Sequence, residues 1–196
     1  MLRVEGLPTH IGGASLTFDV AESQCAGLLG RDLAVLLTLA ENITGLRAPV
    51  TGRVLLDDID THRDRERARA RIAVGLSRAA HPLTTLVEHA ATVSATRAAL
   101  RISVPAAIAR LGLNAGTRLS TPAAKSAAAL LAALLPDVGL VVLHDPFRGL
   151  DAGTRTNAID WIRSLGSSRT SVVITGAEER DVRAVSHFVI DVGAGR

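Results

Sequence analysis

Short apolar runs bounded by turn residues alternate along this chain with longer stretches whose apolar residues follow a helical period. The short runs are typical of buried strands, and the periodic stretches are typical of helices. Strands that alternate with helices predict an α/β fold, a mostly parallel sheet with helices on both faces. Strands are expected at 15–20, 25–30, 52–60, 139–143, 170–175 and 186–192, and helices at 33–44, at 83–113 with an interruption near Pro105, from Thr121 onward, and at 151–165.

The apolar residues of this chain are aliphatic. Hydrophobic residues make up 47% of the 196 positions, whereas aromatic residues make up 2% and tyrosine is absent. A chain of this length can bury a sizeable core as one domain. We therefore expect a single domain whose core is built mainly from alanine, leucine and valine.

The net charge of the chain is slightly positive, at +3, because 22 basic residues stand against 19 acidic ones. The arginine-dense stretch from Thr61 to Ile72 also contains Asp64 and Glu66. Interleaved acidic residues favour a solvated, self-paired surface over an arm that binds nucleic acid. Because aromatic side chains that could stack on bases are scarce, no nucleic-acid partner is expected.

The sequence carries no sign of export or of membrane insertion. Cys25 is the single cysteine, so no disulfide can form within the chain. The N-terminal stretch MLRVEGLPTH lacks the apolar core of a signal peptide, and the longest apolar run, Ala127–Leu135, is too short to cross a bilayer. A cytoplasmic chain is expected, and any attachment to a membrane would be through a partner.

Several landmarks follow one another in an order that resembles the nucleotide-binding subunit of ATP-binding cassette (ABC) transporters. LRVEGL resembles the opening strand of that family, and GLLG followed by ITGLRAPVTGRVLLDDID resembles the Walker A strand, its helix and the next hairpin. RIAVGLS is similar to the strand before the Q-loop, LGLNAGTRLS to the approach to the signature motif, and DPFRGLD to the end of Walker B and the D-loop. The likeness covers nearly the whole chain.

The resemblance implies one ABC-type domain with a P-loop NTPase-like fold. Residues 1–78 and 119–196 would form the RecA-like core with an N-terminal antiparallel β part, and residues 79–118 a short inserted helical subdomain. In this family the core binds and hydrolyses MgATP. A membrane permease docks on the surface around the Q-loop and the helical subdomain.

The phosphate-binding loop of that family is altered in this chain. The pattern G-x-x-x-x-G-K-[ST] uses glycines so that backbone N–H groups can face the phosphates, a lysine for the outer phosphates and a hydroxyl for Mg²⁺. Val35 stands at the second glycine, where a β-branched residue would tolerate a positive φ poorly, and Leu36 and Leu37 stand at the lysine and the hydroxyl. The vestigial loop comprises Gly30, Arg31, Asp32, Val35, Leu36, Leu37 and Thr38.

The positions that the resemblance assigns to hydrolysis are altered as well. His144 stands at the Walker B aspartate that orders Mg²⁺, and Asp145 stands at the catalytic glutamate. Ser77 stands at the Q-loop glutamine and Ala177 at the switch histidine. Imidazole is a poor ligand for a hard cation such as Mg²⁺. No intact catalytic residue and no metal site are therefore expected.

The signature motif keeps two of its five residues. In this family the motif binds the nucleotide that is held by the opposing subunit. Thr121, Pro122 and Ala123 replace the glycines and the glutamine of L-S-G-G-Q. The residues expected at the signature and the dimer interface are Leu119, Ser120, Thr121, Leu150 and Asp151.

His144 and Asp145 have two further interpretations. A histidine beside a carboxylate could act as an acid–base pair, but no nucleophile or oxyanion motif accompanies them. A histidine that forms a hydrogen bond at the edge of the sheet is favoured. Asp151 is expected to N-cap the helix that follows it.

Three functions are compatible with this pattern. The leading hypothesis is a degenerate ABC ATP-binding subunit, deficient in hydrolysis, that works as a structural or regulatory cassette docked on an integral-membrane permease. The first alternative is a residual ATPase that binds or hydrolyses ATP only with a competent partner cassette. The second is a soluble regulatory domain that binds other proteins.

The leading hypothesis includes expectations about ligands and partners. No cofactor is expected, with weak or no binding of MgATP, because the lysine is lost and each charge-assisted hydrogen bond contributes about 1.5–3 kcal/mol. Besides the permease, the chain could pair with itself or with an active cassette subunit. It would lie in the cytoplasm, peripherally on the inner face of the plasma membrane.

Overall fold

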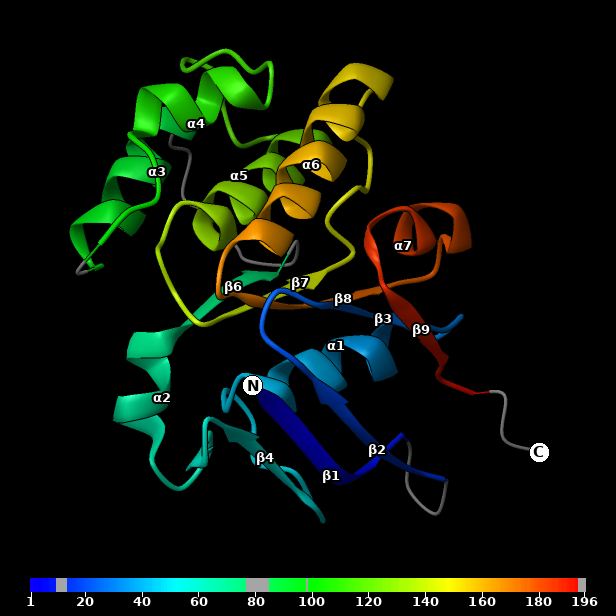
Figure 1. Ribbon diagram of the computed structural model, residues 1–196. Coiled ribbons are helices and arrows are strands. Elements are labelled where there is room, and N and C mark those ends of the chain that lie inside the picture. The colour runs from blue at the N-terminus through cyan, green and yellow to red at the C-terminus, as the bar shows by residue number, and fades with distance from the viewer. Residues whose placement is uncertain (10–13, 77–84, 98, 194–196) are drawn as a thin grey trace.

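The computed structural model contains two sheets with helices packed around them (Figure 1). It describes residues 1–9, 14–76, 85–97 and 99–193. Within these ranges the antiparallel sheet has the order β2-β1-β4-β5, and the parallel sheet has the order β6-β7-β8-β3-β9. The strands are β1 (Leu2–Pro8), β2 (Ser15–Val20), β3 (Cys25–Leu29), β4 (Arg53–Leu56), β5 (Ile59–Asp60), β6 (Ile72–Leu76), β7 (Leu140–His144), β8 (Ser171–Gly176) and β9 (Phe188–Asp191).

The inner strands β7 and β8 of the parallel sheet are buried along their whole length. Strands covered on both faces need no alternation of polar and apolar residues, which explains the continuous apolar runs in their sequences. The predicted α/β fold with a mostly parallel sheet and an N-terminal antiparallel part is confirmed.

The helix α1 (Leu33–Ile43) lies between the two sheets (Figure 1). Its Leu36, Leu39 and Ile43 are fully buried in a core that the helix shares with both sheets, including Leu28 of β3. Because this helix begins directly beyond the end of β3, its first turn lies at the carboxyl end of the parallel sheet.

The other face of the parallel sheet is covered by helices that follow later in the chain (Figure 1). Their apolar residues pack against strand residues such as Ala73, Val141 and Ile174. The expected helices from Thr121 and from Asp151 are confirmed, with Thr121 and Asp151 as N-caps. The helices on this side are α3 (Leu86–Ala95), α4 (Val104–Arg110), α5 (Pro122–Leu134), α6 (Ala152–Ser164), followed by the 3₁₀ turn η1 (Leu165–Ser167), and α7 (Glu179–Val185).

The predicted interruption of the helical segment near Pro105 lies just before this residue, between the end of α3 at Ala95 and the start of α4 at Val104. Pro105 itself lies in the first turn of α4, where the missing N–H of proline leaves no helical hydrogen bond unmade. The predicted start of the segment, at Leu83, lies outside the described residues.

The charged stretch 61–72, predicted as a solvated surface, contains a short helix, α2 (Arg65–Arg71), with Ala68 buried against the core.

The segment between α3 and α4 is attached to the core by Arg101. Its Nε donates a hydrogen bond to the carbonyl oxygen of Pro136 at 3.1 Å, and its Nη2 donates to that of Val138 at 3.0 Å and to the hydroxyl of Thr170. An ion pair with Asp137 at 3.3 Å completes the contacts. The predicted division into a core of 1–78 and 119–196 and a helical subdomain of 79–118 stays a prediction.

Candidate functional site

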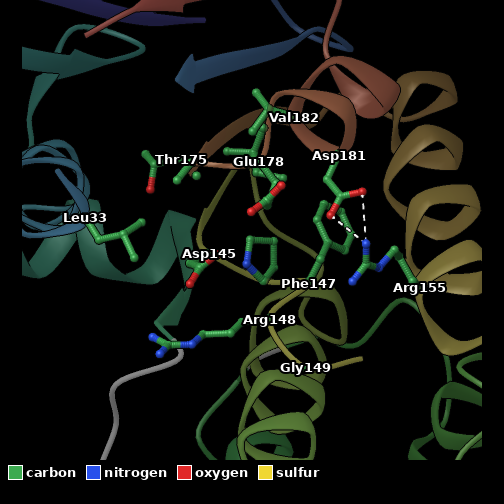
Figure 2. A pocket seen from close by; sticks show the side chains of 14 residues that line it. Leu33, Asp145, Phe147, Arg148, Gly149, Arg155, Thr175, Glu178, Asp181 and Val182 are labelled. Carbon is green, nitrogen blue, oxygen red and sulfur yellow. Dashed lines mark hydrogen bonds and ion pairs between the residues drawn. The ribbon is translucent and has the colours of Figure 1, made fainter. Parts of the chain in front are cut away.

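The carboxyl ends of the parallel strands form one side of a pocket of about 550 Å³. Ligands of open α/β sheets bind at this end of the strands, and the volume is in the range of small-molecule sites. Figure 2 shows Leu33 from α1 on one side of the pocket, and Arg155 and Asp181 on the other. The residues after β7 and β8 lie between them.

The link from β3 to α1 is short, and it ends in a carboxylate cap. Asp32 precedes the helix with extended backbone angles, and its Oδ1 accepts hydrogen bonds from the N–H of Ala34 at 2.8 Å and of Val35 at 3.2 Å. The N–H of Leu36 bonds within the helix, to the carbonyl of Asp32 at 3.1 Å. The first free donors of α1 are therefore occupied by a side chain of the same loop.

The segment that resembles Walker A is helical from Leu33 onward. The expected conflict between Val35 and a positive φ is absent, because Val35 lies in the first turn of α1 with helical angles. Leu36 is fully buried, whereas Val35 and Leu37 are half-buried. These aliphatic side chains extend the packed part of the helix, and the segment is helical where the family pattern has a glycine-rich loop.

The remaining residues of the vestigial loop are polar and lie around the start of α1. Arg31 and Asp32 are exposed. The hydroxyl of Thr38 donates to the carbonyl of Ala34 at 3.0 Å within the helix, and Arg47 donates to that hydroxyl at 3.3 Å. Gly30 allows a close approach, since a Cβ at this position would lie 2.8 Å from the carbonyl oxygen of Val192.

His144 ends strand β7 and is buried, with 3% of its surface exposed. Its Nδ1 forms a hydrogen bond of 2.8 Å with Oγ1 of Thr175, the residue in register with it on β8. The imidazole of His144, at the end of β7, is thereby directed into the sheet.

Asp145 has a left-handed backbone conformation, with φ of 47°, and its N–H donates to the carbonyl of Thr175 at 2.8 Å. Burial raises the pKa of the Asp145 carboxyl above its ordinary value, the positive charge of Arg148 opposes this rise, and the negative charges of Glu178 and Asp181 add to it. The pocket therefore holds a carboxyl group that is easier to protonate than a solvated one.

An ion pair between a partly exposed arginine and a buried aspartate lies on the far side of the pocket. Arg155 of α6 lies 3.2 Å from Asp181 of α7, whose side chain is 8% exposed (Figure 2). Sequence reasoning missed Thr175, Glu178 and Asp181, although they end or directly follow a predicted buried strand, which is where site residues of parallel sheets lie. No pattern in the sequence indicated that Arg155 belongs to this site.

Comparison with known proteins was made in sequence and in structure. No protein-family profile matches the chain. The chain is 28% identical to a Halobacterium salinarum protein named for an ABC transporter ATP-binding role, over 100% of this chain and 90% of that protein. It is 24% identical to the energy-coupling factor transporter ATP-binding protein EcfA2 of Symbiobacterium thermophilum, over 92% of this chain and 68% of the relative.

The chain is a homologue of the ATP-binding subunits of ABC transporters. Solved structures of such subunits share the fold of this cassette. One ATP-binding subunit of an ABC transporter has a TM-score of 0.81 at 17% identity, over 100% of this chain and 89% of the other. A dimeric ATP-binding cassette in a post-hydrolysis state, bound to ADP and Pi, has a TM-score of 0.79 at 15% identity, over 100% of this chain and 98% of the other.

The expectation that this cassette needs no cofactor, with weak or no binding of MgATP, is wrong. Its relatives are named as ATP-binding proteins, and a structural neighbour holds ADP and Pi. The residues of the site are therefore compared with the groups that MgATP requires.

The residues of this cassette fit MgATP in part. The N–H groups of Ala34 and Val35 at the start of α1 are donors suited to phosphate, provided that Asp32 releases them. Asp145 supplies a carboxylate oxygen of the kind that Mg²⁺ prefers. Leu36 and Leu37 supply neither an ammonium group nor a hydroxyl. The described part of the site thus offers two backbone donors and one carboxylate to a nucleotide.

The other predicted site residues of the cassette lie in different places. Ala177 lines the pocket together with Asp145, whereas Ser77 lies outside the described residues. Leu119 is buried and Ser120 exposed, away from the pocket, and Thr121 accepts a hydrogen bond from the N–H of Ala124 at 3.1 Å as the cap of α5.

The signature segment packs beside the loop that precedes α6. The hydroxyl of Ser126 donates to the carbonyl of Arg148 at 2.9 Å, and a Cβ at Gly149 would lie 3.3 Å from the N atom of Ala123. Leu150 is buried in the core beneath this loop. Asp151 is exposed, and its Oδ1 accepts from the N–H of Thr154 at 2.9 Å. In the described part of the cassette, no helix combines the length and the apolar character that a bilayer crossing requires.

Proposed function

We propose that this chain is an ATP-binding subunit of an ABC transporter that binds nucleotide but is deficient in hydrolysis, and that it serves as a structural or regulatory cassette on a membrane permease. The names of its relatives and the shared fold support the ATP-binding role. The altered groups at the carboxyl end of the sheet support the deficiency.

The single observation that carries this proposal is the position of Leu36. The Walker A lysine would have to reach the outer phosphates from this position, but Leu36 points into the core between the sheets and is fully buried. Phosphoryl transfer depends on cationic groups placed against the charge that develops on the transferred phosphate. Without this lysine, a cassette loses more stabilisation of the transition state than of the bound nucleotide. The rate of hydrolysis therefore falls more than the affinity for nucleotide.

The end of β7 supports the same proposal. His144 is held by Thr175 inside the sheet, and Asp145 is one methylene shorter than the glutamate that the family uses to activate water. The raised pKa of Asp145 means that its carboxyl takes up a proton at a higher pH than a solvated carboxyl does, and the protonated form is a poor partner for Mg²⁺.

An integral-membrane permease is the proposed partner, with the chain bound peripherally to the inner face of the plasma membrane. One structural neighbour, from Clostridium perfringens, is part of an ABC transporter complex, with a TM-score of 0.73 at 16% identity, over 97% of this chain and 83% of the other. We propose that the permease docks around Ser77 and residues 79–118, the helical subdomain implied by the family resemblance. A second cassette, either a copy of this chain or an active subunit, would complete the dimer.

The proposed nucleotide binding and the proposed deficiency in hydrolysis are tested by measuring the binding and the turnover of MgATP on the same preparation. MgATP at millimolar concentration is expected to raise the melting temperature, since a ligand at 100 times its Kd adds about 2.7 kcal/mol of stability. Phosphate release is expected to stay at the background that the Asp145→Asn variant gives. Turnover near 1 s⁻¹, a usual rate for enzymes, that disappears in Asp145→Asn would contradict the proposal.

The two alternatives give different results in the same assays. A residual ATPase that depends on a competent cassette would release phosphate only when that partner is added. The partner proposal is tested by affinity purification of the chain from detergent-solubilised membranes. A multi-span permease subunit is expected in stoichiometric amount, and a chain that is recovered from the membranes without any integral-membrane protein would contradict the docking role.

A further inference from the structure

We propose that the carboxylate of Asp32 is a built-in competitor of the nucleotide phosphates at the start of α1, and that it sets the affinity of this chain for nucleotide. This inference rests on the proposed ATP-binding role of the same site. It concerns a residue to which the family pattern gives no role, because Asp32 stands at one of the variable positions of G-x-x-x-x-G-K-[ST].

The first argument is the pair of hydrogen bonds that Asp32 accepts. A single oxygen, Oδ1, takes the N–H groups of Ala34 at 2.8 Å and of Val35 at 3.2 Å. These donors lie at the positive end of an eleven-residue helix, where backbone N–H groups and the helix dipole favour a negatively charged oxygen. A phosphate oxygen and the Asp32 carboxylate therefore require the same donors, and both carry negative charge.

The second argument is the neighbourhood of this end of α1. Leu33, which follows Asp32, lines the pocket of about 550 Å³ at the carboxyl ends of β7 and β8 (Figure 2). A structural neighbour that superposes over the whole chain holds ADP and Pi. Leu33 thus places the turn that Asp32 caps beside this pocket, and a nucleotide that binds there in the proposed role would bring its phosphates close to the Asp32 carboxylate.

The third argument is that Asp32 can give way without disturbing the fold. The residue is exposed, whereas Leu36 in the next turn is fully buried and anchors α1 between the sheets. Rotation of the Asp32 side chain frees both N–H groups while the helix stays in place. Nucleotide binding then includes the loss of two charge-assisted hydrogen bonds, which lowers the affinity but leaves binding possible.

A purely structural cap predicts a different result. Asn caps helices about as well as Asp, and it can accept the same two hydrogen bonds without a charge. If Asp32 serves only the stability of α1, replacing it with Asn leaves nucleotide affinity unchanged. If Asp32 competes with phosphate, the same replacement removes the repulsion and tightens binding.

The test is calorimetric titration of the full chain with MgATP and with MgADP, comparing wild type, Asp32→Asn and Asp60→Asn. Asp60 is the matched control, because its Oδ1 accepts from the N–H of His62 and of Arg63, both at 2.9 Å, in an exposed turn at the far end of the antiparallel sheet. Asp32→Asn is expected to bind both nucleotides about tenfold more tightly, a change of about 1.4 kcal/mol. Asp60→Asn is expected to bind like wild type.

The outcomes separate this inference from the proposed function. Equal or weaker binding by Asp32→Asn, with measurable binding by wild type, overturns the competitor role and leaves the ATP-binding role intact. No binding by any of the three proteins overturns both. The melting temperature without nucleotide reports whether the helix has kept its cap, and Asp32→Ser, another neutral cap, repeats the test if the Asn variant fails to fold.

Discussion

The imidazole of His144 and the hydroxyl of Thr175 form a hydrogen bond of 2.8 Å across the neighbouring strands β7 and β8, and both side chains are almost completely buried. The two residues are directly in register, so the bond joins the ends of two neighbouring inner strands of the parallel sheet. A carboxylate for Mg²⁺ would have to point out of the sheet at this position. This histidine instead stabilises the sheet from within.

Thr175→Val tests this pair. The substitution keeps the volume but removes the hydroxyl partner of His144, and we expect a loss of about 1–2 kcal/mol in the free energy of unfolding, measured by urea denaturation. Thr156→Val is the control, since the hydroxyl of Thr156 is exposed and bonds only within its own helix. Its effect should stay within about 0.5 kcal/mol. Equal effects of the two substitutions would show that the buried hydrogen bond adds no more to the free energy of unfolding than an exposed one does.

Leu36→Lys restores the lysine of the Walker A pattern but is expected to destabilise the protein. Leu36 is fully buried between the sheets, and an ammonium group without a partner there costs several kcal/mol, so we expect a loss of more than about 3 kcal/mol. Leu36→Met, which preserves volume, should cost less than about 1.5 kcal/mol. Near-wild-type stability of Leu36→Lys in urea denaturation would mean that the helix can turn this position toward the pocket.

Asp145→Asn is expected to change the pH dependence of stability. Burial raises the pKa of the Asp145 carboxyl in the folded state, so its favourable contribution is present below the unfolded pKa and is lost as the pH rises through the folded pKa. Asn does not titrate, and it tolerates the left-handed φ of this position. Relative to wild type, the variant should therefore gain stability between about pH 3 and pH 7.

Asp151→Asn gives the opposite sign and serves as the control for that experiment. The N–H and hydroxyl of Thr154 lower the pKa of Asp151, so its contribution is present above the unfolded pKa and is lost as the pH falls. Asp151→Asn should be less stable than wild type at pH 7, with a difference that shrinks in acid. Chemical denaturation at a series of pH values measures both variants, and parallel curves for the two would refute the assigned shifts.

Arg101→Met should detach the segment between α3 and α4 from the core. The side chain of Arg101 is 12% exposed, and its guanidinium bonds to two carbonyls and a hydroxyl. We expect a loss of about 3 kcal/mol, because hydrogen bonds from charged groups contribute about 1.5–3 kcal/mol each. Lysine should recover little of it, since it lacks the planar fork. Arg63→Met, at a side chain that is 88% exposed, is the control and should be neutral.

Much of the fold was predictable from local pattern, and the exceptions have local causes. The buried strands β7 and β8 were predicted because short, continuous apolar runs between turns are typical of strands that are covered on both faces. Pro105 indicates a break in the helical stretch, and the structure has this break just before Pro105, because proline fits the first turn of α4. The helix α7 was not foreseen, because charged residues dominate its sequence and only a few, such as Val182 and Val185, are buried.

Part of the candidate site was predictable from the spacing of residues along the chain. The resemblance to ABC subunits sets Leu36 at the Walker A lysine and His144 at the Walker B aspartate, and these assignments stay predictions. The loop conformation did not follow, because the choice between a phosphate loop and a helix depends on whether these side chains find a core to enter. The buried state of Leu36 between two sheets shows that they do.

The sequence by itself determined most of the strands and helices along the chain and the aliphatic character of the core, since each of these depends on residues a few positions apart. Only the tertiary structure decided that Thr175 holds His144, that Arg155 pairs with Asp181, and that the oxygen of Asp32 occupies the first donors of α1. The first two contacts join residues far apart in the chain, and the packing of the strands and helices in space sets which of them meet. The third depends on a helix whose start is fixed by packing against both sheets.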